Sequence, residues 1–198
     1  MLSGYNYDAQ PFPKSMESMK FLLLETLKLS NPTPDTLPSM PILQVLEMDT
    51  KYVNLLPAGI VDKYPMLEEF WLSNGDLETV EPSFFKRMSS SKIIHMNNNR
   101  INSIDLTGLN PHTEVNLERN AITQLTEQNF RPFVESVLST SASGKIKLMN
   151  NPLECSCDVK WLVSDLKGAH VFESAVCADG TRLADVDPEA INAQCPDV

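Results

Sequence analysis

One template of apolar residues and asparagine recurs along most of this 198-residue chain. Four copies are clear: LQVLEMDTKYVNLL from Leu43, LEEFWLSNGDLETV from Leu67, SKIIHMNNNRINSI from Ser91 and HTEVNLERNAITQL from His112. Their starts lie 24, 24 and 21 residues apart, and weaker copies begin at Leu23 and Ser143. Such a period predicts stacked coils with a shared core, because a single coil cannot cover its own apolar face.

In each copy, apolar residues occupy the fourth and sixth positions, and asparagine occupies the ninth in the clearest copies. Further apolar residues at the eleventh and fourteenth complete the leucine-rich-repeat pattern. The fourth and sixth positions of a short strand point to one side, here the core. These inward residues are Leu46, Met48, Phe70, Leu72, Ile94, Met96, Val115 and Leu117. We therefore expect an α/β fold: a leucine-rich-repeat solenoid with a curved parallel sheet and an irregular or helical convex side.

The remaining template positions predict how neighbouring coils are joined. The asparagines Asn99, Asn120 and Asn151 are expected to donate hydrogen bonds to backbone carbonyls of adjacent coils, whereas Lys51 and Gly75 break the pattern. The return segments should bring Ile60, Phe84 or Phe85, Leu109 and Phe130 into the core. In the last return segment, FRPFVESVLSTSASG, the apolar spacing predicts a convex helix with Pro132 in its first turn.

The four cysteines, Cys155, Cys157, Cys177 and Cys195, all follow the last repeat. This position suggests a cap over the exposed end of the core. Four cysteines permit three disulfide pairings, which spacing alone does not resolve. A zinc site is the first alternative, although the CxC pair is tighter than the usual zinc-ligand spacing. A redox site is the second, but it would need a CxxC motif in a βαβ setting, which is absent.

The stretch NPLECSCDVKWL, followed by two further cysteines, resembles the cysteine-flanked C-terminal cap of extracellular leucine-rich-repeat proteins. The resemblance implies disulfides joining Cys155 to Cys177 and Cys157 to Cys195. The whole ladder of repeats also resembles arthropod secreted repeat proteins, the group that includes the non-catalytic subunits of decapod shrimp luciferases.

The same resemblance implies that Trp161 and Leu162, on a helix that starts near Asp158, cover the end of the core. We expect three regions: residues 1–22 as an irregular segment or remnant coil, 23–150 as about six repeats, and 151–198 as the cap. The boundaries follow the first recognisable repeat and the start of the cysteine motif.

Disulfides would place the chain in an oxidising, extracellular compartment. The start MLSGYNYDAQPFPKSM lacks the features of a signal peptide, and the N-terminal cysteine cap of extracellular relatives is also missing. We therefore expect either the C-terminal part of a longer secreted protein or an incomplete gene model. No apolar run approaches the length of a membrane span.

Charge and motifs argue against several function classes. The formal net charge of −10 is opposite to that of nucleic-acid-binding proteins, which need clustered Lys and Arg. The chain has no Gly-rich phosphate loop, no G-x-S-x-G motif and no H-E-x-x-H motif, so we expect neither an enzyme nor a bound cofactor or metal.

The outward strand positions form the concave face of such a solenoid. The residues expected to bind a partner there are Glu47, Asp49, Glu69, Trp71, His95, Asn116 and Glu118. The middle of the face is acidic, with lysines such as Lys28 and Lys147 only at its ends, so it should attract a protein with a basic or mixed-charge surface.

Trp71 is the expected anchor of this face, because exposed tryptophans beside charged groups are typical of interfaces. Three alternatives stand beside this interpretation. A register shifted by one residue would put Trp71 in the core, His95 could be a bystander rather than a pH-sensitive or catalytic group, and the acidic residues could be an ordinary solvated surface.

The sequence thus favours a non-enzymatic, secreted protein-binding scaffold that uses its concave face. A first alternative is a non-catalytic stabilising subunit of a secreted enzyme, such as a luciferase-like monooxygenase complex. A second is a fragment of a receptor ectodomain.

Overall fold

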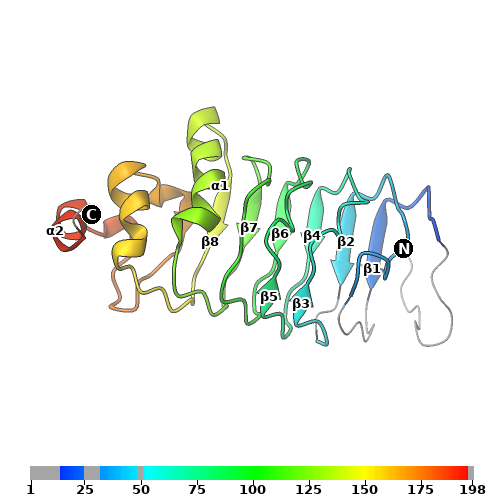
Figure 1. Cartoon of the computed structure of the whole chain (residues 1–198), viewed down its shortest axis with the longest axis horizontal. Helices are drawn as coiled ribbons and strands as arrows, with labels where there is room; N and C mark the ends of the chain where they lie inside the picture. The colour runs from blue at the N-terminus through cyan, green and yellow to red at the C-terminus, as the bar shows by residue number, and fades with distance from the viewer. Residues whose placement is uncertain (1–13, 25–31, 49–50, 196–198) are drawn as a thin grey trace.

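The strands of the protein stack in one row along its long axis, as Figure 1 shows. The structure is a computed structural model that describes residues 14–24, 32–48 and 51–195. Its main sheet is parallel, has seven strands and runs in the order β1-β2-β4-β6-β7-β8-β9. The strands are β1 (Phe21–Leu24), β2 (Val45–Met48), β4 (Glu69–Trp71), β6 (Ile93–His95), β7 (Glu114–Asn116), β8 (Lys145–Lys147) and β9 (Phe172–Glu173).

The register puts equivalent template positions side by side. Leu46 pairs with Phe70, Phe70 with Ile94 and Ile94 with Val115, so each inward side chain lies beside its counterpart in the next coil. All eight inward residues predicted from the repeats are at most 4% exposed. The fold class inferred from the sequence is therefore confirmed: the chain is a leucine-rich-repeat solenoid.

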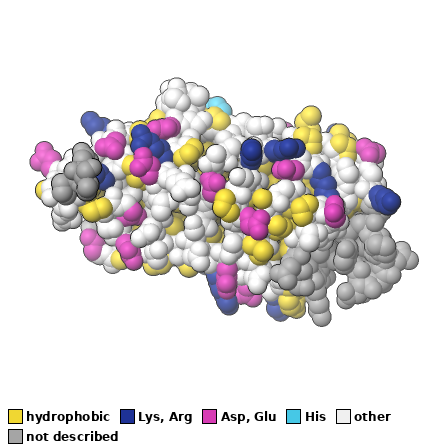
Figure 2. Space-filling model, viewed as in Figure 1, with side chains coloured by type: hydrophobic (Ala, Val, Ile, Leu, Met, Phe, Trp, Pro, Cys, Tyr) yellow, Lys and Arg dark blue, Asp and Glu magenta, His cyan; other side chains and the backbone are white. Residues whose placement is uncertain are grey.

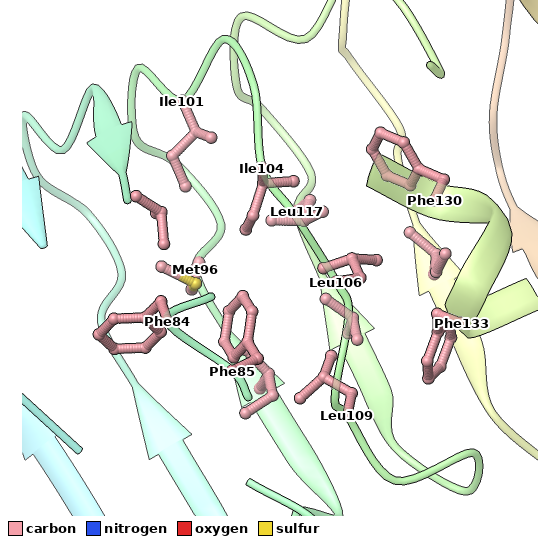
Figure 3. Close-up of a cluster of buried hydrophobic side chains, with 14 of the residues drawn as sticks. Phe84, Phe85, Met96, Ile101, Ile104, Leu106, Leu109, Leu117, Phe130 and Phe133 are labelled. Carbon is pink, nitrogen blue, oxygen red and sulfur yellow. The ribbon is translucent and has the colours of Figure 1, made fainter. Parts of the chain in front are cut away.

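The core is closed from the convex side by the return segments, as Figure 3 shows for the middle of the molecule. Ile60, Leu109 and Phe130 are buried as predicted. Both Phe84 and Phe85 are buried rather than one of them, and their rings meet edge to face with centroids 5.0 Å apart. A small second sheet on the return side pairs β3 (Leu55–Leu56) with β5 (Thr79–Val80).

The buried asparagines join adjacent coils as predicted. The side-chain amide of Asn120 donates to the carbonyl of Met96 in the preceding coil at 3.0 Å and to that of Leu117 in its own coil at 2.9 Å. Its side-chain oxygen accepts the backbone N–H of Ile101 at 3.0 Å. Asn99 and Asn151 make the equivalent set of bonds.

The first strand differs from the sequence interpretation. The weak first repeat placed Lys28 at the end of the outward column, but the strand found here is β1, in which Leu23 pairs with Glu47. FLLL is apolar at every position and so carries no alternation, whereas the following TLKLS alternates and fits the repeat template; the pairing with β2 shows that FLLL forms the strand at this level. The column therefore begins with an apolar residue, while Lys28 itself lies outside the described residues.

The convex helix exists, but it begins earlier than predicted. Helix α1 (Glu127–Thr140) packs Phe130, Phe133, Val134 and Val137 against the core. Pro132 lies inside the helix rather than in its first turn, which corrects the predicted start. The first turn forms ahead of the proline, because the carbonyl of Thr126 accepts the backbone N–H of Phe130 at 3.1 Å, and Pro132, which has no N–H, omits a later bond of the helix.

The C-terminal cap is held by two disulfides. Cys155 is joined to Cys177 and Cys157 to Cys195, with the two Cα atoms 5.6 Å apart in each pair. The pairing implied by the resemblance is confirmed, and the zinc alternative is wrong because every cysteine sulfur is bonded to another sulfur. The cap also adds strand β9 to the main sheet and ends in α2 (Pro188–Gln194).

Trp161 and Leu162 cover the end of the core, as expected, at 4% and 0% exposure. The indole N–H of Trp161 donates to the carbonyl of Leu125 at 2.8 Å, and the carboxylate of Asp158 accepts the backbone N–H of Leu125 at 2.9 Å. The predicted helix near Asp158 is instead a short 3₁₀ turn, Cys157–Val159, followed by a wide turn, Trp161–Asp165. Within the described ranges, no helix is long and apolar enough to cross a membrane.

Candidate functional site

The outward positions of successive strands form a continuous column on the concave face. Glu47, Trp71, His95, Asn116 and Lys147 occupy the same level on β2, β4, β6, β7 and β8. All five are half-buried, as expected for side chains that stand between neighbours at a strand spacing of about 4.8 Å. Six of the seven residues predicted for the binding face lie on this column or beside it, while Asp49 lies outside the described residues.

Trp71 points outward from β4. Its neighbours along the strand, Phe70 and Leu72, are both 0% exposed, so the interpretation that places Trp71 in the core is wrong. The indole N–H donates to a carboxylate oxygen of Glu69 at 3.2 Å. On the other side the indole meets the imidazole of His95, with ring centroids 4.0 Å apart and ring planes at 42°. Two contacts from different strands therefore fix the orientation of the indole.

His95 is held in its neutral form more strongly than a free histidine. Partial burial lowers the pKa of its imidazole, because removal from water disfavours the charged form. The carboxylates of Glu114, Glu69 and Glu118 act in the opposite direction, and the ammonium of Lys147 adds to the lowering. Burial has the largest effect, so His95 presents an uncharged ring beside Trp71 at neutral pH.

The C-terminal part of the face contains an ion pair that the sequence did not predict. The ammonium of Lys147 lies 2.6 Å from a carboxylate oxygen of Glu114, and this hydrogen bond raises the pKa of Lys147. The two residues are 33 positions apart, and only the pairing of β7 with β8 brings them together. The pair neutralises the acidic charge at this point of the face.

The remaining acidic residues of the face are not neutralised in this way. Glu47, Glu69 and Glu118 form no ion pair with any residue that the structure describes. Asn116 accepts the backbone N–H of Glu118 at 3.0 Å, which makes its side chain part of the turn after β7. The acidic character of the face is thus concentrated around Trp71 and at Glu118.

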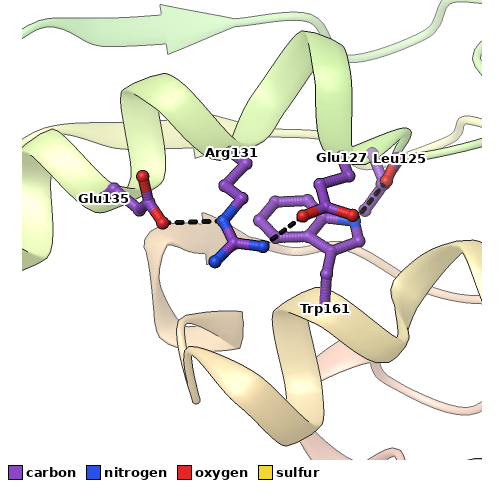
Figure 4. A network of polar contacts seen from close by, with 5 residues as sticks. All are labelled: Leu125, Glu127, Arg131, Glu135 and Trp161. Atoms are coloured by element: carbon purple, nitrogen blue, oxygen red, sulfur yellow. Dashed lines mark hydrogen bonds and ion pairs between the residues drawn. The ribbon is translucent and has the colours of Figure 1, made fainter. Parts of the chain in front are cut away.

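On the face of the molecule seen in Figure 2, acidic and basic side chains are mixed. An open cleft of about 380 Å³ lies between α1 and the cap, and its lining includes Glu127, Asp158, Lys160 and Trp161. Figure 4 shows Arg131 paired along α1 with Glu127 and Glu135, together with the bond from the Trp161 indole to the carbonyl of Leu125. Among the described residues, no group of three or more His, Cys, Asp or Glu could hold a metal ion.

The stacked coils, the outward column and the cross-linked end define a leucine-rich-repeat solenoid with a disulfide-bonded C-terminal cap. No protein-family model matches the chain. The chain is similar to the Oplophorus-luciferin 2-monooxygenase non-catalytic subunit of Oplophorus gracilirostris, with 25% identity over 186 residues. This similarity covers 91% of the chain but only 50% of the relative, so the chain spans about half the length of that subunit.

A solved structure shares the fold. A chain in the crystal structure of the mouse RP105/MD-1 complex superposes with a TM-score of 0.57 at 21% sequence identity. The match covers 75% of this chain and 26% of that chain. It supports the solenoid architecture, and the resemblance to the shrimp luciferase subunits inferred from the sequence is also confirmed.

Proposed function

We propose that this chain is a non-enzymatic, secreted scaffold that binds a protein partner on its concave face. The observation that carries the proposal is the position of Trp71, which stands outward in the middle of the face although a large aromatic side chain gains most from burial. Contacts with Glu69 and His95 hold its ring in one orientation before any partner arrives. A rigid, half-exposed tryptophan among charged groups is the usual form of an interface anchor.

The charges of the face support a partner with a basic or mixed-charge surface. Glu47, Glu69 and Glu118 remain without ion-pair partners among the described residues, so a cationic patch would gain attraction without displacing an existing pair. The overall net charge of −10 acts in the same direction over longer distances. Nucleic acid, which is a polyanion, would be repelled.

The two disulfides support secretion. Disulfides of this structural kind persist in oxidising compartments and are rare where thiols are kept reduced. The similarity to a relative named as a non-catalytic subunit agrees with a role that does not involve catalysis.

Capture of a partner by purified protein tests the proposal. Immobilised wild type, Trp71→Ala and Glu69→Lys would be exposed to the secreted protein fraction of the source tissue, with Glu154→Lys as the control. Glu154 is exposed and lies outside the concave face, so Glu154→Lys makes the same charge change elsewhere. We expect a protein that is retained by wild type and control but lost from both concave-face variants. Equal retention by all four would rule out this face as the binding surface.

A second candidate is a stabilising subunit of a secreted enzyme, favoured by the name of the relative from Oplophorus gracilirostris. In that case the captured protein would be a smaller catalytic chain whose activity survives longer at elevated temperature in the complex than alone. An unchanged inactivation rate would reject the stabilising role and leave the binding role intact.

A further inference from the structure

Trp71 has a different neighbour on each side. Strand β4 lies between β2 and β6, so His95 flanks the indole on one side and Glu47 occupies the same level on the other. The imidazole is already in contact, with ring centroids 4.0 Å apart, and the indole N–H is directed to Glu69. On the side away from His95, the residue at the level of Trp71 is therefore the acidic Glu47 rather than another aromatic residue.

This arrangement combines two features that attract the same kind of ligand. The face of an indole ring attracts cations, most strongly when the cation is partly removed from water. Two acidic residues flank Trp71: Glu47 is its register partner on the adjacent strand, and Glu69 accepts its indole N–H. Neither forms an ion pair with a described residue. Only one of the oxygens of Glu69 accepts the indole N–H, so the carboxylate can accept further hydrogen bonds.

We propose that Glu47, Glu69, Trp71 and His95, here called the Trp71 cradle, bind one arginine side chain that projects from the protein partner. The inference rests on the proposed function and narrows it to a specific recognition element. The guanidinium lies against the Trp71 ring and donates N–H groups to the carboxylates of Glu47 and Glu69.

Arginine fits this cradle better than lysine. Its guanidinium is planar, stacks on aromatic faces, and carries five donors in a fixed fork that can reach two carboxylates at once. A lysine ammonium is a compact, strongly hydrated charge that gains less from a flat ring. The farther acidic residue Glu114 is already paired with Lys147 at 2.6 Å, so Glu47 and Glu69 are the unpaired carboxylates nearest to Trp71.

The state of His95 agrees with this ligand. Burial keeps its ring neutral at neutral pH, although Glu114, Glu69 and Glu118 favour the charged form and Lys147 disfavours it. The neutral imidazole of His95 packs against the Trp71 ring and does not repel a cation bound on the opposite side of that ring.

Nuclear magnetic resonance of the whole chain can test the cradle directly. The chain has two tryptophans, and only the indole N–H of Trp71 lies on the concave face, while that of Trp161 is buried and bonded to Leu125. The probe is acetyl-Gly-Arg-Gly-amide, compared with matched peptides that contain lysine or citrulline, the neutral isostere of arginine. We expect a saturable shift of the Trp71 signal with the arginine peptide, a weaker response with lysine and none with citrulline, while the Trp161 signal stays in place.

Charge-removing variants sharpen the test. Glu47→Gln and Glu69→Gln should each weaken binding of the arginine peptide by about tenfold, because each removes a charge-assisted hydrogen bond. Glu154→Gln should bind as wild type does, and an unmoved Trp161 signal shows that each variant is folded.

The outcomes separate this inference from the proposed function. No shift of the Trp71 signal with millimolar arginine peptide, or an equal shift with citrulline, would overturn the cradle. If partner capture still depended on Trp71 and Glu69, the scaffold proposal would stand with a different ligand chemistry. A shift that persists in both glutamine variants would equally contradict the assigned carboxylates.

Discussion

At the scale of single residues, the buried asparagines are the main polar elements of the solenoid. Each one supplies both a donor and an acceptor, which is why aspartate, an acceptor only when ionised, could not replace it. Asn99, Asn120 and Asn151 are 7–8% exposed and satisfy backbone groups of two coils at once. Their removal therefore leaves buried donors and acceptors without partners.

The first prediction concerns Asn120→Ala. The N–H of Ile101 would lose its acceptor, and the carbonyls of Met96 and Leu117 would each lose one of two asparagine donors and keep the other, from Asn99 and Asn151. We therefore expect the free energy of unfolding to fall by about 1–3 kcal/mol. Asn102→Ala is the control, because Asn102 is exposed and its replacement should change stability by less than about 0.5 kcal/mol. Urea unfolding followed by circular dichroism measures both. If Asn120→Ala and Asn102→Ala changed the free energy of unfolding equally, the hydrogen bonds of Asn120 would not contribute to stability.

The second prediction concerns the pH dependence that arises from His95. Its folded-state pKa lies below the ordinary value of 6.5, so the unfolded chain binds the proton more readily. The contribution of neutral His95 to stability is therefore complete above about pH 6.5 and is lost as pH falls toward the lowered folded pKa.

The His95→Gln variant isolates this effect. The difference in free energy of unfolding between wild type and His95→Gln should shrink or reverse as pH is lowered from about 7.5 to about 5. Urea unfolding at several pH values gives this difference. A difference that grows on acidification would mean that Glu114, Glu69 and Glu118 outweigh burial at this imidazole.

Residue-level inference from the sequence succeeded where the template fixes a role. The inward residues, the asparagines and the outward direction of Trp71 all follow from the period-two alternation of a strand. The Glu114–Lys147 pair could not be predicted, because it depends on the register between two strands separated by the whole of α1.

At the scale of elements, the chain passes very close to its neighbours at Gly144, in the connection from α1 to β8. A side chain at Gly144 would place its Cβ 2.2 Å from the carbonyl oxygen of Pro111, 2.9 Å from Val137 and 3.0 Å from Phe133. The glycine is therefore required by space, since the helix must return directly beneath its own buried face to reach β8.

The third prediction follows from this close approach. Gly144→Ala should destabilise the protein by about 1–3 kcal/mol, the usual effect of overpacking, since backbone atoms of Pro111 must move. The exposed neighbour Ser143 provides the control, and Ser143→Ala should stay within about 0.5 kcal/mol of wild type. Thermal unfolding of the three proteins compares them. An unaffected Gly144→Ala variant would indicate that the return loop is free to shift.

Strands and helices that show a clear apolar periodicity were predicted correctly, but their first and last residues were predicted less accurately. The start of α1 was placed too late because Pro132 resembled a helix-start signal, whereas five helical residues precede it. The first strand was misplaced because FLLL is apolar throughout and lacks the alternation that the neighbouring TLKLS shows, so only its pairing with β2 identifies it. The two-residue strands β3, β5 and β9 carry too little periodicity to be recognised in a sequence.

At the scale of the whole molecule, each coil pairs with the coils on either side of it. The stability of the solenoid is therefore approximately the sum of the stabilities of the coils and of the interfaces between adjacent coils. The cap is the last of these neighbours. Trp161 and Leu162 cover the final core layer, and β9 pairs with β8, so the cap both closes the core and continues the sheet.

The fourth prediction concerns the cross-links of the cap. The disulfides close loops with sequence separations of 22 and 38 residues, and removal of either by paired Cys→Ser replacement should cost about 2–5 kcal/mol. Because coupling is between neighbours, hydrogen exchange should accelerate most in β8 and β9 and least in β2 and β4. A uniform acceleration along the sheet would instead show that the solenoid unfolds as a single unit.

The architecture as a whole could be predicted from the sequence because the same sequence template, and so the same local structure, recurs several times. The sequence does not identify a ligand for the concave face, since the outward residues of a solenoid are free of the packing constraints that shape the template. The chemistry of the Trp71 cradle emerges only when strands 24 residues apart are aligned, which places Glu47, Trp71 and His95 at one level.

The bond between Cys157 and Cys195 also determines how the molecule would respond to mechanical tension. A pulling force applied beyond Cys195 enters the backbone again at Cys157, so the intervening residues carry no load. With a sequence separation of 38, the stretched contour is shortened by roughly 130 Å at about 3.5 Å per residue. Under such a force the residues between Cys157 and Cys195 would be shielded from extension, and the tension would pass directly to the coil next to the cap.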